Sequence, residues 1–177
     1  MANDFLSNTL KIFKEYQSLG DKALERMDVD QLHWEPNVGS NSAAVIVKHM
    51  SGNMRSRFTE FLTTDGEKPN RNRDAEFTTD AALIKEEILA LWRMGWNVVY
   101  AAVEPLTEAD LQRVIFIRGE EYTVTRALQR QIAHYAYHVG QLVFLSKMFA
   151  GENWESLSIP RGASDDFNER MRNARKS

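Results

Sequence analysis

The chain has 177 residues, of which 43% are hydrophobic and 27% are charged, a composition typical of a folded globular domain. Its 25 acidic residues outnumber its 22 lysines and arginines, which argues against nucleic acid as a partner. It contains no cysteine, which excludes disulfides, thiolate metal ligands and a cysteine nucleophile.

Neither secretion nor membrane insertion is expected from the sequence. The first residues lack a basic region followed by an apolar core, and no segment approaches the roughly 20 apolar residues that a membrane span needs. We therefore expect a cytoplasmic protein. No repeat or glycine-rich linker divides the chain, so we expect one domain over residues 1–177, with a frayed tail from about residue 164.

The apolar periodicity predicts three helices in the first two thirds of the chain. Apolar residues recur three and four positions apart over residues 5–27, and a second helix is expected over residues 42–62. Residues 63–79 are rich in Gly, Pro, Asn and charge, which is typical of a long surface connection. The third helix is expected from about residue 80 to Pro105, whose ring stops a helix from continuing.

The last third predicts a short hairpin and then a fourth helix. A short helical turn is expected over residues 107–110, followed by strands over residues 114–117 and 121–124. A helix over residues 125–150 then ends at Gly151. The sequence therefore predicts an all-α fold, a four-helix bundle with crossover connections and a short β-hairpin before the last long helix.

Two histidines of the last helix have the spacing of metal ligands. His134 and His138 lie one turn apart and point to the same face, among apolar residues that we expect in the bundle interior. An uncompensated buried imidazole costs on the order of 1–3 kcal/mol, and a shared metal ion would remove that cost for both. A hydrogen-bonded pair of core histidines is the alternative that spacing alone leaves open.

His49, on the shoulder of the apolar stripe of the second helix, is the candidate third ligand. Three neutral imidazoles favour Zn²⁺, Ni²⁺, Cu²⁺ or Fe²⁺ over Mg²⁺ or Ca²⁺, and leave a position open for water or substrate. The sequence around these histidines matches neither the zinc-protease motif nor the di-iron motif. His33 has no helical partner, and we do not expect it to be a ligand.

Several nearby residues are candidates for accessory roles. Asn53, Gln131 and Gln141 flank the histidines and would orient the ligands or hold water, although ordinary polar contacts are an equally simple interpretation. Arg161 would bind an anionic substrate, with a plain surface arginine as the alternative. Gly140 would allow another helix to come close.

Two segments resemble the DinB-like superfamily of bacterial four-helix proteins, which includes YfiT-type metal-dependent hydrolases and bacillithiol transferases. They are residues 47–53 (VKHMSGN) and residues 134–142 (HYAYHVGQL), the latter similar to the family's H-x-x-x-H-x-G-Q signature. Residues 61–69 (FLTTDGEKP) and 156–162 (SLSIPRG) look similar to one uncharacterised branch. The resemblance spans nearly the whole chain.

By that resemblance, His49, His134 and His138 correspond to the family's metal triad, with zinc or nickel as the expected ion. It also implies a homodimer and a transferase that joins a low-molecular-weight thiol to an electrophile, or a hydrolase; the metal would lower the pKa of the thiol. The absence of cysteine is consistent with a nucleophile brought by a cosubstrate. No residue is marked as a general base by its spacing, so a non-catalytic, metal-stabilised dimeric binding or stress-response module is the alternative.

Overall fold

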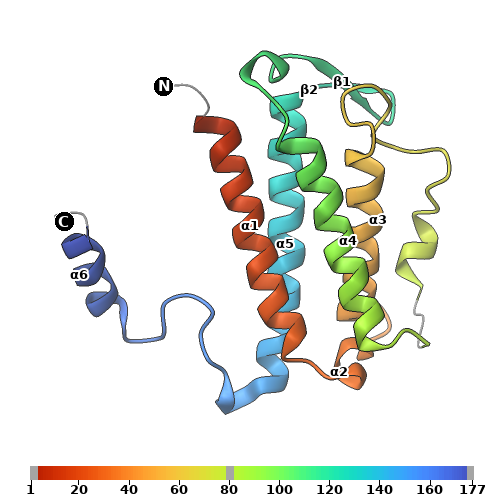
Figure 1. Cartoon of the computed structure of the whole chain (residues 1–177). Coiled ribbons are helices and arrows are strands. Elements are labelled where there is room, and N and C mark those ends of the chain that lie inside the picture. Colours follow the sequence, from red (N-terminus) through yellow and green to blue (C-terminus); the bar gives the residue numbers. More distant parts are fainter. Residues whose placement is uncertain (1–3, 79–81, 175–177) are drawn as a thin grey trace.

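Four long helices lie side by side in one bundle (Figure 1). The computed structural model describes residues 4–78 and 82–174. Its long helices are α1 (Asp4–Glu25), α3 (Ala43–Phe58), α4 (Lys85–Val103) and α5 (Val124–Ala150). The predicted all-α bundle is confirmed. Within the described residues, no helix is both long enough and apolar enough to cross a membrane.

The connection between α3 and α4 is a crossover. α1 and α5 run in one direction and α3 and α4 in the other, and the described residues 59–78 return along the outside of the bundle (Figure 1). We call residues 59–84 the crossover segment. It carries one short 3₁₀ turn, η1 (Asp74–Phe77), where the sequence indicated only a surface connection.

The helix boundaries differ from the prediction at both ends of the crossover segment. α3 ends at Phe58, four residues earlier than expected, and Glu60 adopts a positive φ of 49° that no helix can contain. α4 begins at Lys85, and the backbone N–H of Ile84 donates to Glu87 Oε2 at 3.0 Å in a capping arrangement. The expected start near Asp80 lies outside the described residues.

The predicted hairpin is confirmed, and it anchors the crossover segment. Strands β1 (Val114–Ile117) and β2 (Glu120–Thr123) pair in antiparallel register, after a short turn η2 (Glu108–Asp110). The two turn residues, Arg118 and Gly119, both have positive φ, as two-residue hairpin turns require. Their backbone N–H groups donate to the carboxylate of Asp65, each at 2.8 Å. One carboxylate therefore fixes the start of the crossover segment to the hairpin.

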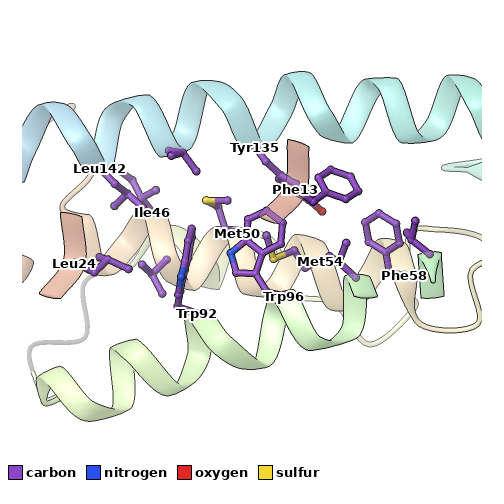
Figure 2. Close-up of a cluster of buried hydrophobic side chains, with 14 of the residues drawn as sticks. Phe13, Leu24, Ile46, Met50, Met54, Phe58, Trp92, Trp96, Tyr135 and Leu142 are labelled. Carbon is purple, nitrogen blue, oxygen red and sulfur yellow. The ribbon is translucent and has the colours of Figure 1, made fainter. Parts of the chain in front are cut away.

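The core is formed by aromatic, methionine and aliphatic side chains from all four helices (Figure 2). Tyr135 of α5 is fully buried, and its ring centroid lies 5.8 Å from that of Phe13 and 5.5 Å from that of Trp96. Trp92 packs one turn before Trp96, and its indole N–H donates to Asp21 at 2.7 Å. These aromatic side chains therefore join α1, α4 and α5 in one core.

Two short helices were not expected from the sequence. α2 (Val29–His33) occupies the turn between α1 and α3, and Asp28 and Gln31 form a capping box at its start. After a turn η3 (Gly151–Asn153), the chain ends in α6 (Ser164–Ala174), which lies away from the bundle (Figure 1). The tail that we expected to fray from residue 164 forms a helix over residues 164–174 and contributes no buried side chain.

Glycine at position 95 allows α3 and α4 to approach closely. A Cβ atom there would lie 2.8 Å from Met54 Sδ and 3.1 Å from Ser51 Cα. Gly140 differs, because a Cβ atom there would meet no heavy atom within 4 Å. The helix contact expected at Gly140 is thus absent from the described structure and occurs at Gly95 instead.

These two glycines predict opposite effects on stability. Gly95→Val should lower the free energy of unfolding by about 1–3 kcal/mol because the side chain overpacks the interface between α3 and α4. Gly140→Ala should raise it by about 0.5–1 kcal/mol because alanine favours a helix and has room there. Chemical denaturation of both variants measures the difference; equal effects would contradict the assigned contact.

Candidate metal centre

Three histidine rings converge between α3 and α5. His49 comes from α3, and His134 and His138 come from α5. Their ring centroids are 4.8–5.4 Å apart, and one ring nitrogen from each lies within 4.8 Å of the other two. His49 and His138 are 5% exposed, and His134 is half-buried. The three side chains thus form a cluster that could hold a metal ion.

The two helices place the rings in different ways. On α5, the four-residue spacing stacks His134 and His138 one turn apart, as the sequence indicated. His49 lies at the edge of the apolar face of α3. It is nevertheless buried, because α4, α5 and the crossover segment all pack around this helix. Ser42 fixes the start of α3 by accepting the backbone N–H of Val45 at 3.2 Å.

Hydrogen bonds orient two of the rings so that their Nε2 atoms face the centre. Glu76 Oε2 lies 3.0 Å from His49 Nδ1, and Gln141 Oε1 lies 2.9 Å from His138 Nδ1. Because these oxygens accept, both Nδ1 atoms carry the proton, which leaves a lone pair on each Nε2.

Two of the inner nitrogens are within hydrogen-bond distance of each other, and the third has no partner within the described chain. His138 Nε2 is buried and has no hydrogen-bond partner within the described chain, and His49 Nε2 lies 3.3 Å from His134 Nε2. A buried acceptor without a donor costs about 1–3 kcal/mol. A cation bound to all three nitrogens would remove this cost, so the donor set fits a transition metal.

Glu76 is the residue that sequence analysis missed. It lies in η1 of the crossover segment, is 7% exposed, and also accepts from Arg71 Nε at 2.7 Å and from Arg71 Nη2 at 2.8 Å. Gly52 makes room for it, because a Cβ atom there would collide with Glu76 Oε1. A carboxylate behind a histidine is a common support for a metal ligand. Positions 49 and 76 lie in different elements, so helical spacing does not relate them. The sequence indicated a functional segment here only through the length of the connection that contains Glu76.

Burial keeps the α5 histidines neutral. It lowers the pKa of His134 to about 3, with a further contribution from the neighbouring His138 and His49. It also lowers the pKa of His138 to about 4, against an opposing hydrogen bond to Gln141. Burial disfavours ionisation of Glu76, but hydrogen bonds from His49 and Arg71 outweigh it and lower the pKa of this carboxyl. The two α5 imidazoles are therefore neutral at neutral pH, and the Glu76 carboxylate lies behind the His49 ring.

The other predicted site residues take different positions. Asn53 is buried and accepts from the Tyr135 hydroxyl at 3.3 Å, and Gln131 is buried with its Oε1 unpartnered within the described chain. Both line a cavity of about 320 Å³ together with His134. Arg161 is exposed in the segment after α5 and does not line this cavity, so its contact with a substrate stays a prediction.

The fourth histidine stands apart from the cluster, as expected. His33 Nε2 lies 2.8 Å from the carbonyl oxygen of Leu83, at the start of α4. It is not part of the group of potential ligands found in the described residues.

Comparison with known proteins yields one family. The family model described as "Protein of unknown function (DUF1572)" matches residues 1–163, which include the bundle and all three clustered histidines. No significant match was found among curated proteins or among solved structures.

The lowered pKa values predict how the stability of the metal-free protein depends on pH. Between about pH 6.5, the ordinary histidine value, and pH 4, the unfolded chain binds more protons than the folded chain at His134 and His138. The free energy of unfolding should therefore fall as pH drops through this range, as measured by denaturant titration with a chelator present. A His134→Gln, His138→Gln double variant should lose most of this dependence, whereas a flat profile for the unmodified protein would contradict the buried neutral rings.

Proposed function

The chain belongs to the DUF1572 family, and we propose that it is a DinB-like metal-dependent enzyme that transfers a low-molecular-weight thiol or hydrolyses its substrate. The observation that carries this proposal is the position of His134. Its ring belongs to the histidine cluster and also lines the cavity of about 320 Å³, so a substrate in the cavity would reach the metal position.

Three neutral imidazoles favour Zn²⁺ or Ni²⁺ as the bound ion. His49, His134 and His138 would hold it, leaving an open coordination position on the cavity side. When bound, the ion supplies Lewis acidity, which lowers the pKa of a thiol or water placed beside it.

Other residues of the chain orient the histidine rings and pack against them. Glu76 and Gln141 hold two rings with Nε2 towards the centre. Phe77 packs against the His49 ring, with centroids 4.6 Å apart, and the buried Tyr135 packs beside His134, with centroids 5.6 Å apart. These two rings cover the sides of His49 and His134 that they contact, and the cavity lies beside His134.

The cavity offers specific contacts for a polar substrate. Gln131 Oε1 is a buried acceptor without a donor in the described structure, so a substrate N–H, O–H or S–H group would satisfy it. Arg130 lines the same cavity and forms no ion pair with a described carboxylate, which favours a substrate with negative charge. With no cysteine in the chain, a thiol nucleophile must enter as a cosubstrate.

A second candidate, a non-catalytic metal-stabilised binding or stress-response module, is favoured by one observation. Among the described residues that line the cavity there is no carboxylate to act as a general base. Both candidate functions include the metal site, but only the enzyme would turn over a substrate.

We also propose that the protein is a cytoplasmic homodimer. Tyr137, Phe144 and Met148 are exposed on one side of α5 at spacings of seven and four residues, which gives this helix an apolar outer stripe that a second copy would cover.

Metal binding tests the ligand assignment. His134→Ala or His138→Ala should abolish stoichiometric binding of Zn²⁺ or Ni²⁺, and His49→Ala should weaken it strongly with helical content retained. Glu76→Ala should weaken it by about 10–100-fold because the His49 ring loses its support. Titration calorimetry and elemental analysis measure these effects.

The matched control for this series is His33→Ala, which removes the histidine outside the cluster. It should leave the metal affinity unchanged. One ion per chain retained in the His134→Ala, His138→Ala double variant would contradict the site.

Catalysis is tested with a panel of small thiols and electrophiles. We expect the metal-loaded protein to accelerate thiol transfer to at least one electrophile, with activity lost in His138→Ala and retained in His33→Ala. Hydrolysis of activated esters and amides is measured in parallel. Stoichiometric metal without turnover in either assay would favour the non-catalytic module.

A further inference from the structure

A second cavity lies between α3 and the crossover segment. Its volume is about 580 Å³, within the range of small-molecule sites, and it shares no lining residue with the cavity beside His134. We call it the α3 groove. Its wall on α3 runs from Lys48 to Ser56, and the rest of its lining comes from residues 59–60 and 68–76 of the crossover segment and from Leu91 of α4.

The α3 groove carries an excess of positive charge. Four cationic side chains line it, against the two carboxylates of Glu60 and Glu76, which leaves two positive charges in excess. The cationic side chains are Lys48, Arg55, Lys68 and Arg71. The whole chain has a formal charge of −3, so the excess is local and does not reflect the overall composition.

Three of these cations have no carboxylate partner. Arg71 is paired with Glu76, but within the described residues neither Lys48, Arg55 nor Lys68 forms an ion pair. Unpaired cations that line a concave surface concentrate the potential for an anion.

Two of the ammonium groups are held in place by the backbone. Lys48 Nζ donates to the carbonyl oxygen of Thr78 at 3.2 Å, and Lys68 Nζ donates to that of Asp65 at 2.6 Å. Each ammonium group has three N–H donors, so donors remain for a ligand. Arg55 lies seven residues after Lys48, on the same side of α3 and two turns further along.

A buried hydroxyl adds an independent sign of a polar occupant. Ser51 lines the α3 groove, is 3% exposed, and its Oγ has no hydrogen-bond partner within the described residues. Leaving a buried hydroxyl without a hydrogen-bond partner is costly, and most buried hydroxyls in proteins have one. A ligand or a water molecule that bonds to Ser51 Oγ would remove that cost.

We propose that the α3 groove binds a small anionic molecule bearing a phosphate or carboxylate group. Lys48, Arg55 and Lys68 would neutralise and hold the anion, and Ser51 would add a hydrogen bond. This site is separate from the proposed metal chemistry, and its occupancy does not require a bound metal. Glu76 is shared by the groove wall and the metal centre, so an anion in the groove lies beside the support of His49.

The test is titration calorimetry of the protein, with and without added Zn²⁺, with glycerol 3-phosphate, inorganic phosphate and succinate, and with glycerol as the uncharged comparison. We expect saturable binding of one equivalent of at least one anion and none of glycerol. The phosphate and succinate arms distinguish which anionic group the groove prefers. Absence of binding by all three anions would overturn the proposal.

Matched variants locate the bound anion. Lys48→Gln with Arg55→Gln should raise the Kd at least tenfold, whereas Arg126→Gln with Lys147→Gln removes the same charge from exposed positions of α5 and should leave the Kd unchanged. Equal losses in both double variants would show a general charge effect and overturn the site.

Loss of anion binding in His138→Ala, with the groove residues intact, would instead assign the anion to the metal centre and would also overturn the proposal. Thermal unfolding of each variant confirms that it is folded. Because the readout is anion binding, a failed metal or turnover experiment leaves this test intact.

Discussion

The close approach of three imidazole rings inside the bundle is the constraint on which the site depends. His49 Nε2 and His134 Nε2 lie 3.3 Å apart, and His138 Nε2 is buried without a donor in the described structure. Protonation would relieve the lone pairs but would place charge in a buried environment, and burial lowers the pKa of both α5 histidines. A bound cation satisfies all three nitrogens without that cost.

The crossover segment completes the site although it contains little regular structure. Asp65 ties its start to the hairpin, and Arg71 binds Glu67 and Glu76 in its middle. Glu76 then reaches His49 across Gly52, where any side chain would collide with the carboxylate. Charged contacts also run from Arg118 of the hairpin through Glu67, Arg71 and Glu76 to the histidine cluster. Arg71 and Glu76 line the α3 groove as well.

Helical periodicity predicted the bundle and the pairing of His134 with His138, because a regular helix fixes side-chain direction by spacing alone. His49 meets His134 and His138 only because α3 packs against α5, and residue spacing within one helix does not predict such packing. The resemblance to the DinB-like superfamily was what indicated His49 as the third ligand. Glu76 could not be predicted, since the path of an irregular segment depends on tertiary contacts. The capping residues Asp28 and Gln31 could have predicted α2 from the sequence. The helix has only five residues, which is too short to show an apolar periodicity.

X-ray absorption spectroscopy of the metal-loaded protein tests the central claim most directly. Convergence of the three rings on one ion predicts a coordination shell with about three imidazole nitrogens at about 2.0–2.1 Å for zinc, together with the outer-shell scattering that is diagnostic of histidine rings. A shell of oxygen ligands without imidazole scattering would contradict the account.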